Sequence, residues 1–147
     1  MTRLLANNDL VNLLYYTDQD PLSQPHLTDE EKKKNIYEKL IKIVPRIGPK
    51  ETANSIIAIR VINGHKDNSN SEFRNIKIGI EVFVPLTQWI IKNTNLRPFA
   101  ILGEIEKSLA EKKINGLGKI EGGDFDLNFL TEEIGAYEQT FWITTYE

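Results

Sequence analysis

The clearest pattern of hydrophobic and polar positions in the chain lies at residues 75–84. Successive side chains of a strand point to opposite faces, so an alternation of this kind predicts a strand with one face in a core. Residues 55–62, which are rich in isoleucine, predict another strand before it. The alternating apolar residues are Ile76, Ile78, Ile80, Val82 and Val84.

A helical pattern follows at residues 98–112, where apolar residues recur at the three- and four-residue spacing of one helix face. Pro98 suits the first turn of a helix, because its missing N–H is not needed there. We therefore predict a helix over 98–112. Its apolar stripe consists of Phe99, Ile101, Leu102, Ile105 and Leu109.

The N-terminal part of the chain predicts short helices joined by extended segments. Polar residues at 7–9 can cap a helix over 8–16, and two prolines predict an extended linker over 18–25. Thr28 and Glu31 form a capping-box pattern, which predicts a helix from about residue 29. Residues 41–44 fit either a helix or a strand, and residues 45–50 a connector. We expect one domain, 1–147, with an N-terminal helical arm and linker at 1–27 and a core at 28–147.

A polar stretch at residues 63–72 separates the first two predicted strands. It begins with Asn-Gly, a pair that favours a hairpin turn, and therefore predicts a long, exposed hairpin loop. Exposed loops carry contacts to partners more often than buried elements do. Its first six residues are Asn63, Gly64, His65, Lys66, Asp67 and Asn68.

Two further strands are predicted at residues 120–129 and 137–146, with a turn between them. The resulting order of helices, two strands, a helix and two strands is not the strict alternation of a doubly wound nucleotide fold. We therefore predict an α+β fold, with a mostly antiparallel sheet and helices packed on one face.

Large aromatic residues are candidates for a contact surface with another protein. Trp89, Trp142 and Tyr146 are candidates for exposed side chains, which usually mark contacts between proteins. Packing in the core or at its edge explains them equally well. On the last strand, Tyr137, Phe141 and Ile143 are expected on one face and Trp142 and Tyr146 on the other.

Composition narrows the function classes. The chain lacks cysteine, which excludes disulfides, thiolate zinc sites and cysteine nucleophiles. The net charge of −3 argues against broad nucleic-acid binding, which needs a dense basic face. Apolar runs are too short for a signal peptide or a membrane span, so we expect no membrane partner. The protein is then made and used in a cytoplasm, or it leaves the cell by a route other than secretion.

Candidate catalytic and metal-binding residues each have a simpler explanation. His26 and His65 lie in predicted exposed segments far apart in the sequence, without a carboxylate at metal-ligand spacing. Asp124 and Asp126, with Glu121, fit a cation site or the solvated face of a half-buried strand, in which they alternate with Phe125, Leu127 and Phe129.

Glycines and lysines add no chemistry of their own. The glycines after the predicted helix lack the Gly-Lys-Ser/Thr of a phosphate loop and fit turns; they are Gly116, Gly118, Gly122 and Gly123. The lysines at 32–34 fit a solvated helix face. We expect no catalytic residue, no cofactor and no enzyme activity.

The order of elements from residue 36 onward resembles that of the tail-terminator and tail-completion proteins, the head–tail joining or neck proteins, of long-tailed bacteriophages. The resemblance rests on IVPRIGP at 43–49 after a helical start and on IGIEVFVP at 78–85. It continues with the helix FAILGEIEKSL at 99–109 and a closing β pair that contains GGDF at 122–125 and YEQTFWI at 137–143. Residues 1–35 have no counterpart in it.

The resemblance implies a virion structural protein, assembled in the host cytoplasm, that forms a ring, commonly a hexamer. Such a ring terminates the tail tube and joins it to the head connector, and DNA passes through it without sequence-specific recognition. Loops and termini make the contacts above and below such a ring, so the resemblance implies interface contacts in the 63–72 loop, at residues 63–68, and in the 1–25 arm. A head-closure or adaptor protein of the neck is an alternative, although the helix over 98–112 favours the terminator. An alternative of another class is a small metal-dependent binding or enzyme domain that uses Glu121, Asp124 and Asp126.

Overall fold

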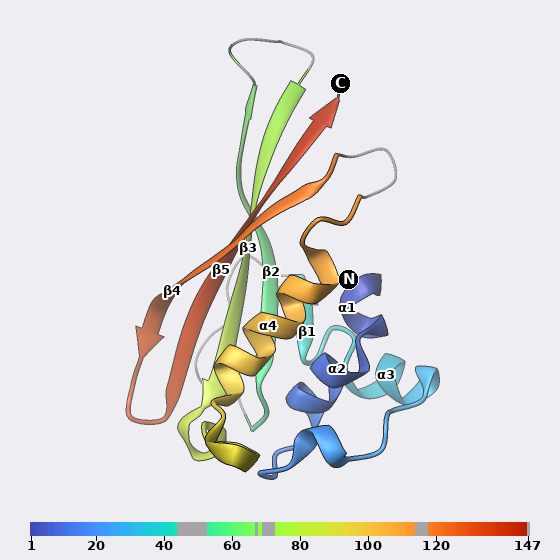
Figure 1. Ribbon diagram of the computed structural model, residues 1–147, viewed down its shortest axis with the longest axis vertical. Helices are drawn as coiled ribbons and strands as arrows, with labels where there is room; N and C mark the ends of the chain where they lie inside the picture. The colour runs from blue at the N-terminus through green and yellow to red at the C-terminus, as the bar shows by residue number, and fades with distance from the viewer. Residues whose placement is uncertain (44–52, 67, 69–72, 114–117, 147) are drawn as a thin grey trace.

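The computed structural model describes residues 1–43, 53–66, 68, 73–113 and 118–146, and for Phe73 and Tyr146 it describes the backbone alone. These residues form an α+β fold in which helices cover one face of a sheet (Figure 1). The fold class predicted from the hydrophobic pattern is therefore confirmed.

The described strands form one sheet of order β1-β2-β3-β5-β4. β1 is parallel to β2, and the β2–β3, β3–β5 and β4–β5 pairs are antiparallel. The bounds are β1 Ile41–Ile43, β2 Ile56–Lys66, β3 Phe73–Pro85, β4 Ile120–Leu130 and β5 Ile134–Tyr146.

α4 lies diagonally across the sheet, and the N-terminal helices lie beside it (Figure 1). The α-helices are α1 Thr2–Ala6, α2 Asn8–Tyr15, α3 Asp29–Asn35 and α4 Arg97–Leu109. Short 3-10 helices lie between these elements: η1 Pro21–Ser23, η3 Leu86–Gln88 and η4 Lys92–Thr94.

The main hydrophobic core lies between the helices and the sheet. Leu10, Leu14, Ile80, Ile101 and Ile105 belong to it and are almost completely buried. A smaller cluster, made by Ile56, Ala58, Phe83, Ile134 and Ala136, lies in the same strands outside this core. Since Ile80 and Phe83 occupy alternate sides of β3, the two clusters lie on opposite faces of the sheet.

Several predicted elements match the structure closely. The alternation at 75–84 falls within β3, and the helical stripe at 98–112 becomes α4. The capping box is present: the Thr28 hydroxyl accepts from the Glu31 amide at 3.2 Å, and the Glu31 carboxylate accepts from the Thr28 amide at 2.8 Å. α4 ends before residue 112 because Ala110 takes an extended conformation. Of the residues that fit a helix or a strand, Ile41–Ile43 form β1, whereas the predicted connector at 45–50 lies outside the described residues.

The N-terminal segment contributes to the core. Residues 2–6 form α1, which the sequence analysis did not predict, and Leu4 at its centre is completely buried. α2 adds Leu10, Leu13 and Leu14 to the main core. The segment expected as an arm is thus packed against α4 as part of the helix layer (Figure 1).

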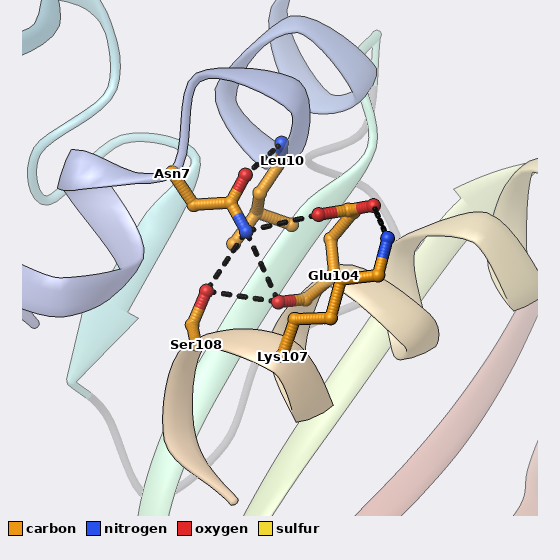
Figure 2. A network of polar contacts seen from close by, with 5 residues as sticks. All are labelled: Asn7, Leu10, Glu104, Lys107 and Ser108. Atoms are coloured by element: carbon orange, nitrogen blue, oxygen red, sulfur yellow. Dashed lines mark hydrogen bonds and ion pairs between the residues drawn. The ribbon is translucent and has the colours of Figure 1, made fainter. Parts of the chain in front are cut away.

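Asn7 joins α2 to α4 (Figure 2). Its Oδ1 accepts from the Leu10 amide at 3.0 Å, which caps α2. Its Nδ2 donates to Ser108 Oγ at 2.9 Å, to Glu104 Oε2 at 3.1 Å and to the Glu104 carbonyl at 3.2 Å. Lys107 Nζ lies 2.8 Å from the other oxygen of the Glu104 carboxylate. One side chain therefore satisfies a helix terminus and fixes the position of α2 on α4.

The prediction of a loop beginning at Asn63 is wrong for its first four residues. Residues 63–66 continue β2 and pair with Lys77, Ile76, Asn75 and Arg74 of β3. A β-bulge between Val61 and Asn63 absorbs one extra residue, so the Asn-Gly pair lies inside the ladder instead of forming the turn. β2, β3 and the end of β5 consequently extend past the helix layer (Figure 1).

Candidate functional site

The outer edge of β2 leaves large apolar side chains exposed. β1 pairs only with Ile57–Ile59, so among the described residues no strand lies beyond β2 from Arg60 to Lys66. Val61 is 70% exposed and Ile62 is 38% exposed on this strand. We call residues 60–66 the β2 edge. Exposed apolar side chains on an unpaired strand are typical of a contact with another chain.

The face of the sheet opposite the helices carries Trp142, which is 42% exposed. Lys77, its partner across the β3–β5 ladder, places Nζ 5.2 Å from the centre of the indole ring. This cation–π contact orients the ring without burying it. Of Trp89 and Trp142, the two candidate aromatic residues whose side chains the structure describes, Trp142 is the one that fits an exposed contact surface.

A polar network occupies the middle of the same face. Arg60 of β2 forms ion pairs with Glu138 of β5 and, at 3.9 Å, with Glu81 of β3. Asn128 of β4 donates to the second oxygen of Glu81. Glu81 is buried, and a buried carboxylate is tolerated only where partners satisfy it. The network therefore stabilises the sheet, and its residues are not free for catalysis.

An aromatic cluster covers the other end of the sheet on the helix side. The Tyr137 ring of β5 lies 5.2 Å from Phe99 of α4, 5.9 Å from Phe125 of β4 and 6.3 Å from Trp89. The Phe99 and Phe125 rings lie 5.8 Å apart. Trp89 packs against the main core and is partly buried, so for this residue the core explanation is the better one.

The outer edge of β4 is more exposed than the sequence predicts. Phe125 is 46% exposed and Leu127 is 55% exposed, although the alternation placed both on a half-buried face. They lie on an edge strand, where α4 supplies only Phe99 as an aromatic neighbour of Phe125. We call residues 121–130 the β4 edge. It is a second surface on which apolar side chains meet solvent.

The acidic candidates lie on the opposite face of this strand. Glu121, Asp124 and Asp126 pair with Trp142, Thr140 and Glu138 of β5, which share one face, and all three are exposed. Among the described residues, no group of three or more histidine, cysteine or acidic side chains could hold a metal ion. The structure thus offers no assembled cation site at these positions.

Two of the candidate glycines, Gly122 and Gly123, lie inside β4. Gly122 and Gly123 have φ of 106° and 119°, values that other residues rarely adopt, and they lie at a β-bulge inside the strand. They are therefore strand residues rather than the turn predicted for them. A Cβ on Gly118 would lie 2.1 Å from the Thr144 carbonyl oxygen, whereas Gly116 lies outside the described residues.

The remaining candidates are dispersed. His26 is exposed, and His65 lies in β2 opposite Asn75. Lys32 is buried and donates from Nζ to Asn8 at 2.7 Å, so the prediction of a wholly solvated lysine face is wrong for this residue. A cavity of about 360 Å³ lies beside it, mainly apolar, between α1 and α3.

Arg97 is a buried residue that the sequence analysis did not identify. It is completely buried at the start of α4 and donates to the carbonyl oxygens of Leu13, Tyr16, Asp18 and Gln88 at 2.6–2.9 Å. Leu13 and Tyr16 lie at the end of α2, where helix carbonyls lack intrahelical partners. Burial lowers the pKa of Arg97, and the nearby Asp18 carboxylate opposes that shift.

The residues expected at an interface do not form one patch. Trp89 belongs to the helix side of the sheet and Trp142 to the opposite face. Residues 63–66 lie along the β2 edge with Asn68 exposed nearby in sequence, whereas Asp67 lies outside the described residues. Tyr146 pairs with Phe73 at the end of β5 through its backbone. The structure instead gives two exposed strand edges at opposite sides of the sheet.

None of the described helices is long and apolar enough to cross a membrane. A family model described as YomW matches residues 7–141 of the chain. No curated protein matches it.

Proposed function

The chain belongs to the YomW family, and we propose that it is a structural subunit of a phage virion that assembles into a ring at the neck. In this role the ring ends the tail tube and joins it to the head connector. YomW is a phage-region-like protein family of Bacillus, and this supports a phage-related origin. The observation that carries the proposal is the pair of exposed edges, because each presents apolar side chains beside charged ones.

Self-association is favoured by where these side chains lie. Val61 and Leu127 are exposed at 70% and 55%. Val61 lies on the part of β2 that β1 does not cover, and Leu127 lies on β4 at the other side of the sheet. Two different contact surfaces at opposite sides of a subunit produce a head-to-tail arrangement, which closes into a ring when the rotation between neighbours permits. A subunit with a single surface would stop at a dimer.

The test is the mass of the native protein in solution and its position in particles. We expect native mass spectrometry over a range of concentrations to give closed assemblies, with six times the 16.9 kDa chain mass as the leading expectation. Electron microscopy of purified tail tubes mixed with the protein should then show one ring at a tube end. A monomer at every concentration that never joins tubes would contradict the proposal.

The same experiment separates the two neck roles. A terminator ring binds the end of a tail tube in the absence of heads, whereas a head-closure or adaptor ring binds filled heads in the absence of tails. Binding to tubes alone supports the terminator role, and binding to heads alone supports the adaptor role.

A further inference from the structure

The two strand edges differ in charge, and this difference identifies the contact between neighbouring copies. We infer that the β2 edge of one copy pairs with the β4 edge of the next copy, so that the sheet continues from subunit to subunit. The inference rests on the proposed ring. Its partner is a second copy of this chain, and its site is defined by residues 60–66 and 121–130.

Both edges have the backbone groups that such pairing needs. Within the described residues, β2 has no strand partner beyond Ile59 on its outer side, and β4 is the last strand in the sheet. Unpaired N–H and C=O groups on an outer strand form a template for a strand of another chain. Because β1 covers Ile57–Ile59, β2 offers residues 60–66 to a neighbour, a stretch that residues 121–130 of β4 are long enough to pair along its whole length.

Strand direction also fits a head-to-tail contact. The β2–β3, β3–β5 and β4–β5 pairs are all antiparallel, so β4 runs opposite to β2 within one copy. A neighbouring copy in the same orientation therefore brings its β4 antiparallel to β2. Antiparallel pairing is slightly more stable per residue than parallel pairing.

The faces of the two edges match when the sheet continues. Val61 pairs with Ile78, and Leu127 pairs with Tyr137, positions that lie on the helix side of the sheet with the main core. Neighbouring copies would thus place Val61 beside Phe125 and Leu127 on the helix side. Their exposed apolar surfaces would be removed from water together.

Charge favours the unlike pair of edges over either like pair. The β2 edge carries Lys66, the imidazole of His65 and Arg60, which already pairs with Glu81 and Glu138, and it lacks an acidic residue. The β4 edge carries Glu121, Asp124 and Asp126 and lacks a basic residue. Lys66 lies on the helix side, opposite Arg74, whereas the acidic side chains lie on the other face with His65. The two edges therefore attract through their net charge rather than through directly opposed ion pairs. A two-fold contact of β4 with β4, or of β2 with β2, would bring like charges together.

Charged residues and bulges on an outer strand also prevent unwanted pairing, and this is the alternative role for β4. Charge reversal distinguishes an edge that pairs with a neighbouring copy from an edge that is protected from pairing. One variant reverses the β2 edge (His65→Glu with Lys66→Glu), and the other reverses the β4 edge (Asp124→Lys with Asp126→Lys). All four side chains are exposed, so the fold should tolerate both changes.

Each variant alone should self-associate about tenfold more weakly than the wild-type chain, because the two edges at every contact then carry the same sign of charge. An equimolar mixture should regain assembly, since every contact in an alternating ring again joins opposite charges. Native mass spectrometry resolves the mixed rings when one variant is isotopically labelled. The controls are Lys33→Glu with Lys34→Glu on α3 and Glu132→Lys with Glu133→Lys in the β4–β5 turn, which should assemble like the wild type.

The outcomes separate the inference from the proposed function. If the wild type forms rings and both edge variants do as well, or if mixing fails to restore assembly, the edge pairing is wrong while the ring stands. If the wild type forms open chains that the edge variants abolish and the mixture restores, the edge pairing stands and the ring is wrong. A wild-type chain that never self-associates overturns both.

Discussion

The guanidinium of Arg97 donates from Nη1 to the Leu13 carbonyl oxygen at 2.6 Å, which ties the start of α4 to the end of α2. Arg97 also bonds the carbonyls of Tyr16, Asp18 and Gln88. A cation near the C-terminal carbonyls of a helix is favourable in itself. Arg97 therefore holds the end of α2 against the start of α4, as Asn7 holds the start of α2 against the end of α4.

Replacing Arg97 with methionine should strongly destabilise the fold. The variant keeps most of the buried volume but leaves several buried carbonyls without a donor, so we expect the free energy of unfolding to fall by about 3 kcal/mol or more. Urea denaturation followed by circular dichroism measures it. Arg97→Lys keeps the charge but has fewer donors. Its free energy of unfolding should lie between those of the wild type and the methionine variant. A loss below about 0.5 kcal/mol for the methionine variant would show that the carbonyls find other partners.

Two substitutions of Asn7 can separate its cap on α2 from its hydrogen bonds to α4. Asn7→Ala removes both the cap on α2 and the bonds to Glu104 and Ser108, and should cost about 1–2 kcal/mol of unfolding free energy. Asn7→Asp keeps a capping oxygen but places a carboxylate beside that of Glu104. If the aspartate variant is as stable as the wild type at neutral pH, the bonds to α4 contribute nothing measurable. The exposed Asn95→Ala is the matched control and should be neutral.

The ionised carboxylate of Asp20 should stabilise the fold at neutral pH and lose this effect in acid. The pKa of its carboxyl is lowered by a hydrogen bond from Ser23 and by Lys92, whose Nζ lies 3.2 Å away, with desolvation opposing them. A folded-state pKa below the unfolded one gives stability that is present above about pH 4 and is lost as pH falls through the folded value. Asp20→Asn should therefore destabilise the fold slightly at pH 7, with the difference vanishing at low pH. The exposed Glu132→Gln, in the β4–β5 turn, is the control, and a difference that persists in acid would contradict the sign.

The sequence predicted the elements whose pattern is set by burial on one side. β3 and α4 follow from the spacing of Ile80, Val82, Ile101 and Ile105, because a one-sided core imposes the period of the element on the apolar residues. The capping box of α3 was found because both of its partners lie within four residues. Local signals of this kind do not require the tertiary structure.

The sequence predictions failed for features that are determined by tertiary contacts rather than by local sequence. Asn63-Gly64 has the local preference of a turn, yet the ladder with β3 continues through it by means of a bulge. Phe125 and Leu127 alternate like core residues but lie on an edge strand that little else covers. The role of Arg97 depends on carbonyls about 80 residues earlier in the chain, which no spacing reveals. Both candidate edges therefore required the sheet order before they could be recognised.

Gly135 and Trp89 provide a test of packing at the aromatic cluster. A Cβ on Gly135 would lie 2.4 Å from Cη2 of the Trp89 ring, far inside van der Waals contact. Gly135→Ala should force the indole away from Tyr137 and cost about 1–3 kcal/mol. Thermal unfolding measures the loss, and the tryptophan fluorescence of the folded protein should change because the environment of Trp89 changes.

A double variant shows whether the loss comes from this contact. Trp89→Leu alone should destabilise the fold by removing partly buried ring surface, and it also opens space above Gly135. In the Trp89→Leu background, Gly135→Ala should therefore cost far less than in the wild type, with a coupling energy of about 1 kcal/mol or more. Additive effects of the two substitutions would mean that the alanine is harmful for another reason, such as a change in the β5 backbone, and that the indole ring is not what requires glycine at this position.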